Sequence, residues 1–188
     1  MHAEENASSA IGMSTGQSPR TLVHASCVVL GEACAPFGGA VEGAVLLLGA
    51  SGAGKSDVSL RLIAMGARLL SDDQTQLFAS DGRLFAEAAP SLHGRMEVRG
   101  VGILAMKAAQ PAPVILTVRL DETAEIPRLP EPATHKLPQG LEGCPEPPFL
   151  ILSPFEVSTA AKIAAAGAAL AQGGFVAGLI SPSSSHFF

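Results

Sequence analysis

The stretch Gly49-Ala50-Ser51-Gly52-Ala53-Gly54-Lys55-Ser56 decides the fold. One glycine, four residues and then Gly-Lys-Ser is the spacing of a phosphate-binding loop. The apolar residues 45–48 lead into it, and the helical pattern of residues 57–65 follows it. Glycines let the backbone curl so that its N–H groups point inward at phosphate, and the N-terminus of a helix adds positive partial charge. The sequence therefore predicts a phosphate-binding loop between a strand and a helix.

The last two residues of this loop carry polar side chains with separate expected roles. Lys55 is expected to reach the outer phosphates of a nucleotide, and the hydroxyl of Ser56 to ligate Mg²⁺. The alternative is a glycine-rich turn that precedes Lys-Ser by chance. The strand before the loop and the helix after it favour nucleotide binding.

Composition narrows the class of partner. The chain has 188 residues, of which 47% are hydrophobic, which predicts one domain with a sizeable core. A net charge of −5, without a Lys/Arg-rich run, argues against nucleic-acid binding, and the lack of Trp and Tyr leaves few rings for stacking on bases. Small molecules or another protein are the expected partners.

The cysteines and the hydropathy pattern indicate in which cellular compartment the protein is expected. Three cysteines without a CxxC pair indicate reduced thiols, and hence a cytoplasmic protein, rather than disulfides or a zinc site. No run of about 18 apolar residues predicts a membrane span. Residues 1–20 lack an apolar core of the signal-peptide kind and are expected to be a disordered lead. A catalytic domain is expected at 21–173, followed by a flexible tail at 174–188.

Periodicity and turn residues predict an α/β fold with a mixed sheet. Val58, Leu62 and Met65 are expected on the buried face of the first helix. Residues 121–148, with seven prolines, are expected to form a long surface segment. The expected strands are 22–30, 44–48, 67–70, 114–120 and 149–152, with a further strand over 96–104 that two glycines break. A hairpin is expected over 74–86, with its turn at Asp81-Gly82, and the expected helices are 56–65 and 155–171.

An acidic pair follows the strand that comes after the first helix. Asp72 and Asp73 end this strand, and carboxyl ends of neighbouring parallel strands share one edge with the phosphate loop. Asp73 could hold Mg²⁺ through water or accept a proton from an attacking hydroxyl. An Asp that caps a turn is the alternative.

Three further polar residues remain ambiguous from periodicity alone. His24 is either a packed core histidine or a catalytic group. Glu97 and Arg99 share one face of their expected strand. They form either a solvated face or a carboxylate that reaches Mg²⁺ beside an Arg near phosphate.

Taken together, these residues resemble the catalytic domain of the HPr kinase/phosphorylase family. The resemblance spans roughly residues 21–170 and is carried by His24, the phosphate loop, Asp72-Asp73 and the stretch Glu97-Val98-Arg99-Gly100-Val101-Gly102-Ile103. It implies a P-loop domain like the nucleotide-binding part of phosphoenolpyruvate carboxykinase. It also implies an ATP-dependent serine kinase of HPr, the phosphocarrier of the bacterial sugar phosphotransferase system, which assembles as a homo-oligomer, usually a hexamer.

The resemblance also implies roles for single residues. Lys55 contacts phosphates, Ser56 and Glu97 ligate Mg²⁺, and Asp73 takes the proton from the substrate serine. His24 matches an active-site histidine. Arg128 is the nearest candidate for a further active-site arginine.

Departures from the family pattern limit what it implies. The usual N-terminal domain of the family has no counterpart here, which is expected of a short form. Residues 152–158 lack the arginine of a loop that serves dephosphorylation by inorganic phosphate, so weak or absent phosphorylase activity is expected. Two rival functions remain: a small-molecule kinase on the same fold, and an ATP-sensing regulator that signals to a partner such as a sensor kinase.

Overall fold

The computed structural model describes residues 19–36, 41–90, 93–173 and 177–179. The expected lead over 1–20 and tail over 174–188 lie mostly outside these ranges. Where they are described, the chain is attached to the domain. Arg20 forms an ion pair with Glu87 and lies 5.1 Å from the centre of the Phe78 ring. Leu179, which lies beyond the domain boundary expected at residue 173, is 2% exposed and packs in the core.

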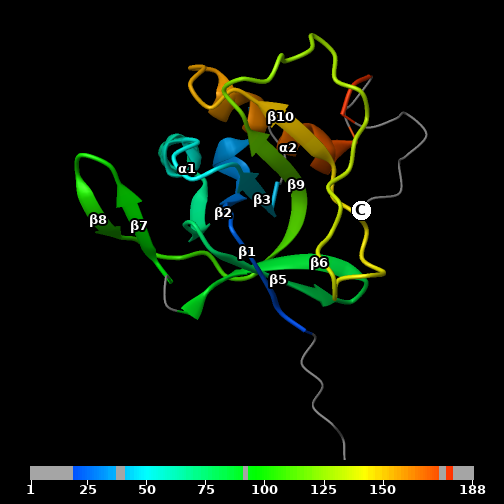
Figure 1. Ribbon diagram of the computed structural model, residues 1–188, viewed down its shortest axis with the longest axis horizontal. Helices are drawn as coiled ribbons and strands as arrows, with labels where there is room; N and C mark the ends of the chain where they lie inside the picture. The colour runs from blue at the N-terminus through cyan, green and yellow to red at the C-terminus, as the bar shows by residue number, and fades with distance from the viewer. Residues whose placement is uncertain (1–18, 37–40, 91–92, 174–176, 180–188) are drawn as a thin grey trace, which may run out of the picture.

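One mixed sheet contains eight strands in the order β1-β5-β6-β9-β3-β2-β4, with β10 also paired to β9 (Figure 1). Strands β3, β9 and β10 are parallel, and β2 is antiparallel to both of its neighbours, β3 and β4. The mixed α/β fold is therefore as predicted. The strands are β1 (Thr21–Val23), β2 (Ser26–Leu30), β3 (Gly43–Leu48), β4 (Arg68–Ser71), β5 (Thr75–Ser80), β6 (Arg83–Ala88), β9 (Ala112–Leu120) and β10 (Phe149–Leu152).

The helices are α1 (Lys55–Ala64) and α2 (Thr159–Gln172), with a short 3₁₀ turn, η1 (Glu32–Cys34). Val58 and Leu62 of α1 are fully buried, as predicted. Met65 is 38% exposed because it follows the last helical residue and leaves the buried face. Helix α2 begins at residue 159 rather than 155, and residues 153–158 form a loop.

Strand β3 is buried on both of its faces. Val45 and Leu47 pack in the cluster that includes side chains of α1 and α2. Ala44 and Leu46 pack in a second cluster, which includes side chains of the β5–β6 hairpin and Leu141 of the proline-rich segment. The phosphate loop therefore follows a strand whose position is fixed by packing on both of its faces. In the part of the chain that the structure describes, no helix is long and apolar enough to cross a membrane.

Two of the predicted strands are wrong because each changes direction inside the predicted range. Residues 22–30 form β1 and β2 with a bend at His24, since β1 pairs with β5 whereas β2 pairs with β3 and β4. Residues 96–104 form a separate hairpin of β7 (Arg95–Val98) and β8 (Gly102–Ala105), which projects from the domain in Figure 1. Gly100, at φ 82°, lies in its turn. The β5–β6 hairpin turns at Asp81 and Gly82, as predicted.

Candidate active site

The phosphate loop joins β3 to α1. Gly49, Gly52 and Gly54 all have positive φ, and Gly54 is the residue that precedes the first turn of α1. Because Gly54 has no side chain, the first N–H groups of the helix are not capped by it and remain directed at the loop. The local backbone is therefore that of an anion-binding loop at a helix N-terminus, as the sequence predicted.

The strand order explains why distant residues meet at this loop. Strand β4 is not a direct neighbour of the phosphate-loop strand β3, because β2 lies between them, antiparallel to both. Strands β3 and β4 therefore run in the same direction and end at the same edge, where β2 begins. This edge brings together the loop after β3, Asp72 and Asp73 after β4, and His24 just before β2.

Lys55, His24 and Asp73 form a continuous chain of polar contacts. Lys55 Nζ lies 3.0 Å from His24 Nε2 and donates to the carbonyl oxygens of Gly49 and Ala50 at 3.2 and 3.1 Å. His24 Nδ1 lies 3.3 Å from Asp73 Oδ1. Since an ammonium group can only donate, Nε2 is the acceptor, and Nδ1 then carries the ring proton toward Asp73.

Asp72 joins three groups of this cluster, a position that the sequence did not reveal. It is 7% exposed, and its Oδ1 accepts from the hydroxyls of Ser56 at 2.8 Å and Ser26 at 2.9 Å. Its Oδ2 accepts from the main-chain N–H of Glu97 at 3.2 Å. The available signal was an acid directly after an apolar strand.

Asp73 has an unusual backbone and a more open side chain. Its φ is 66°, which non-glycine residues rarely adopt, and Asp tolerates it better than most. Its main-chain N–H donates to the Ser26 hydroxyl at 3.2 Å, and its side chain is 59% exposed. Asp72 therefore faces inward at Ser56, while Asp73 faces solvent beside His24. Such a division suits one acid that binds and one acid that meets a substrate.

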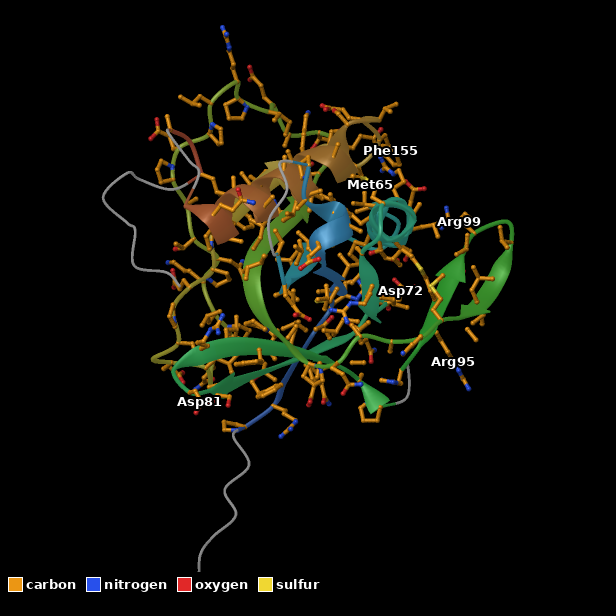
Figure 2. All side chains as sticks on the ribbon, turned by 180° about the vertical axis from the view of Figure 1, so that it is seen from behind. Met65, Asp72, Asp81, Arg95, Arg99 and Phe155 are labelled. Atoms are coloured by element: carbon orange, nitrogen blue, oxygen red, sulfur yellow. The ribbon has the colours of Figure 1, made fainter. Side chains whose placement is uncertain are left out.

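The remaining predicted residues lie at different distances from this cluster. Glu97 is tied to Asp72 through its main chain, and its carboxylate is exposed. Arg128 is exposed in the proline-rich segment and belongs to none of the contacts that join the other site residues. Figure 2 shows Asp72 inside the molecule and Arg99 near the turn of the β7–β8 hairpin, where it is exposed.

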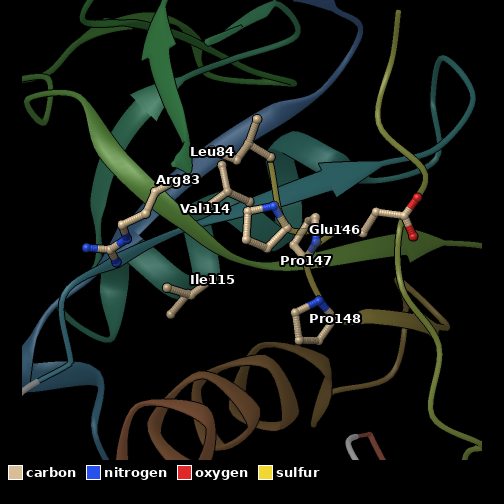
Figure 3. Close-up of a pocket in the computed structure, with 8 residues that line it drawn as sticks. Arg83, Leu84, Val114, Ile115, Glu146, Pro147 and Pro148 are labelled. Carbon is tan, nitrogen blue, oxygen red and sulfur yellow. The ribbon is translucent and has the colours of Figure 1, made fainter. Parts of the chain in front are cut away.

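A cavity of about 360 Å³ adjoins the phosphate loop. Its walls are residues 49–53 of the loop, residues 119–122 at the end of β9, and Pro154 and Phe155 after β10. A second hollow, shown in Figure 3, holds about 50 Å³ between Leu84, Val114, Ile115 and prolines of residues 145–148. That volume suits a water molecule or two rather than a nucleotide.

A magnesium site here would depend on few protein ligands. Among the described residues, no group of three or more His, Cys, Asp or Glu could hold a metal ion. Mg²⁺ in phosphate-transfer sites typically uses one or two protein oxygens, phosphate oxygens and water. The Ser56 hydroxyl beside the Asp72 carboxylate supplies oxygen ligands of this kind.

Gly49→Ala is expected to destabilise the protein. A Cβ at this position would lie 2.9 Å from the carbonyl oxygen of Leu120, a main-chain atom that cannot rotate away, and φ is 153°. We expect a loss of about 1–3 kcal/mol in the free energy of unfolding, measured by urea denaturation. Gly31→Ala is the control, because nothing lies within 4 Å of its Cβ position. Equal midpoints for the two variants would contradict the prediction.

The fold and the loop define the class: an α/β domain with a P-loop phosphate site at one edge of a mixed sheet. Residues 38–116 match the family model described as HPr Serine kinase C-terminal domain. This segment is similar to that family, which confirms the resemblance found in the sequence. It contains the phosphate loop, the acidic pair and Glu97. His24 lies outside it and is brought to the site by the fold.

Known proteins are similar to this chain in sequence over part of their length. The HPr kinase/phosphorylase of Streptococcus salivarius is 46% identical over 61 residues, which are 32% of this chain and 20% of that protein. That of Clostridium botulinum is 43% identical over 60 residues, with the same shares. The matches span about a fifth of the length of these relatives. The structure of the Hpr(Ser) kinase/phosphatase from Coxiella burnetii has a TM-score of 0.60 at 20% identity and covers 81% of this chain and 95% of that one, which shows the fold.

Proposed function

We propose that this protein is an ATP-dependent serine kinase whose substrate is the phosphocarrier HPr. The observation that carries the proposal is the chain from Lys55 through His24 to Asp73, which connects a phosphate-binding lysine to an open carboxylate. A site that only binds a nucleotide needs the lysine but not the carboxylate. The similarity to HPr kinases supports HPr as the acceptor. We further propose that the protein acts in the bacterial cytoplasm and as a homo-oligomer.

Each side chain has a distinct role in the proposed reaction. The loop N–H groups and Lys55 hold the phosphates of ATP. The serine oxygen of the acceptor attacks the γ-phosphorus, the bond from this phosphorus to the bridging oxygen breaks, and ADP leaves. Asp73 accepts the serine proton, and His24 orients the Asp73 carboxylate through Nδ1–H. Bound to Ser56, Asp72 and Glu97, Mg²⁺ would neutralise charge on the phosphate oxygens.

The reverse reaction has less support. The loop over residues 153–158 contains no arginine of its own. Arg61 of α1 reaches this loop, but its guanidinium donates to the carbonyl oxygens of Glu156 and Pro154. A guanidinium bound to main-chain oxygens is not free to bind inorganic phosphate. We therefore propose that phosphorolysis of serine-phosphorylated HPr is weak or absent.

Lys55→Ala is expected to lower kcat/KM for HPr phosphorylation by roughly 10²- to 10³-fold, because one preorganised donor to the transferring group is lost. The measurement is transfer of labelled phosphate from ATP to purified HPr, with mass spectrometry to locate the phosphoserine. Lys107→Ala removes an exposed lysine outside the site and is the control.

The same assay separates the rival functions. Purified protein with labelled ATP, Mg²⁺ and lysate of its own cells would label a small protein, a metabolite or nothing. Label on a metabolite would favour a small-molecule kinase. ATP binding without transfer to any acceptor would favour a nucleotide-sensing regulator.

A further inference from the structure

The cavity and the acidic residues lie on opposite sides of the phosphate loop. In the sheet, β9 and β10 lie on one side of β3, and β2 and β4 lie on the other. His24, Asp72 and Asp73 belong to the β2–β4 side. The cavity is walled by residues that follow β9 and β10. A phosphate chain bound in the loop would therefore have the acceptor site at one end and this cavity at the other.

The cavity has an apolar wall that the fold itself does not require. Phe155 is 59% exposed, which is unusual for so large an apolar side chain, whereas Pro154 beside it is buried. Arg119, Asp121 and Glu122 also line the cavity and supply its polar side chains. A ring-sized apolar surface facing a few polar groups is typical of small-molecule sites, and 360 Å³ falls within their usual range.

The loop that carries Phe155 is fixed to its surroundings by main-chain contacts. Arg61 donates to the carbonyl oxygens of Pro154 and, at 2.9 Å, of Glu156, and Arg61 is itself paired with Asp57 at 2.9 Å. The Thr159 hydroxyl donates to the carbonyl oxygen of Ser153. These contacts hold the main chain of the loop without using the aromatic ring, which stays free to meet a ligand.

The same loop also touches the phosphate loop. A Cβ added to Gly54 would lie 3.1 Å from Pro154 Cβ and 3.7 Å from Phe155 Cε1. The ring therefore sits beside the turn that leads into Lys55. A ligand whose phosphates occupy the loop and whose other end fills the cavity would bring that end against this ring.

We infer that Phe155 is the stacking surface for the base of the nucleotide donor. The inference rests on the proposed function only in taking a nucleoside triphosphate as the donor. Stacking of a base on an aromatic side chain is favourable for any base, because every base has a π-face. The base would lie on Phe155, and the triphosphate would run past Gly49–Ala53 to Lys55.

Inorganic tripolyphosphate separates stacking from phosphate binding, because it fills the loop without a base. Phe155→Ala is expected to weaken ATP binding by roughly 5- to 100-fold, the range that loss of one stacking ring gives. Binding of Mg²⁺-tripolyphosphate is expected to stay unchanged. Phe155→Tyr should restore ATP binding, whereas Phe155→Leu, which keeps bulk but has no ring, should not. Isothermal titration calorimetry measures all four proteins with both ligands.

A second reporter uses the absence of tryptophan from the sequence. Phe155→Trp would introduce the one tryptophan of the chain at the stacking position. ATP is expected to quench its fluorescence, and tripolyphosphate is not. The inference would be overturned if Phe155→Ala bound ATP with unchanged affinity, or if it lost affinity for ATP and tripolyphosphate equally. It would also be overturned if the wild-type protein did not bind ATP. If ATP binds as expected but HPr is not phosphorylated, the proposed function fails and this inference stands.

Discussion

Asp73→Asn is expected to lower kcat for phosphoryl transfer by roughly 10²- to 10⁴-fold, the usual contribution of a positioned general base. The amide of Asn cannot accept the serine proton. Binding of ATP should change little, since Asp73 contacts His24 and Ser26 rather than the phosphate loop. The measurement is single-turnover transfer from ATP to HPr, together with calorimetric titration of ATP.

The backbone conformation of Asp73 is one that Asn also tolerates, so the effect of Asp73→Asn can be assigned to the side chain. Asp73 and Asp81 are the non-glycine residues with positive φ in the described chain, at 66° and 50°. Asn tolerates this conformation about as well as Asp, so little strain is added. Asp81→Asn, in the exposed turn of the β5–β6 hairpin, is therefore a matched control and should leave kcat unchanged. A wild-type rate in Asp73→Asn would exclude Asp73 as the base.

Asp72→Ala is expected to impair both folding and magnesium dependence. It would leave the hydroxyls of Ser26 and Ser56 and the N–H of Glu97 without their acceptor. Loss of an acceptor from buried donors typically costs about 1–3 kcal/mol, which urea denaturation would measure. The Mg²⁺ concentration that gives half-maximal kinase activity should rise at least tenfold, since an oxygen ligand beside Ser56 is removed.

Ser26→Ala separates these two effects. It removes a fully buried hydroxyl that donates to Asp72, but it leaves the carboxylate and Ser56 in place. Its stability should fall by a comparable amount, while the Mg²⁺ dependence should stay near that of the wild type. If Ser26→Ala and Asp72→Ala shift the Mg²⁺ dependence equally, Asp72 acts through packing rather than as a metal ligand.

Local sequence patterns predicted those elements whose structure depends on interactions between residues close together in the sequence. The phosphate loop and helix α1 follow from glycine spacing and an apolar stripe, and β3 follows from an uncharged run that is buried on both faces. The β5–β6 hairpin follows from Asp81-Gly82, a pair that adopts positive φ. Each of these signals involves residues within one turn or one strand of each other.

Two predictions were wrong where the local sequence pattern is compatible with more than one structure. Residues 96–104 alternate like a strand, but Gly100 lets the chain reverse, and two short strands pair with each other. Phe155 lies in a composition that favours helix, yet the helix begins at Thr159, and Arg61 binds the carbonyl oxygens of Pro154 and Glu156 in the loop before it. That partner is 93 to 95 residues away in the sequence.

The phosphate loop, with Lys55 and Ser56, was determined by the sequence itself, because its function depends on backbone conformations that glycine spacing encodes. The other side of the site, with His24, Asp72 and Asp73, was decided by the tertiary structure. Only the insertion of β2 between β3 and β4 places His24 against Lys55 and Asp73, and Asp72 against Ser56. Strand order depends on pairing between distant segments, which the residues of one segment do not specify.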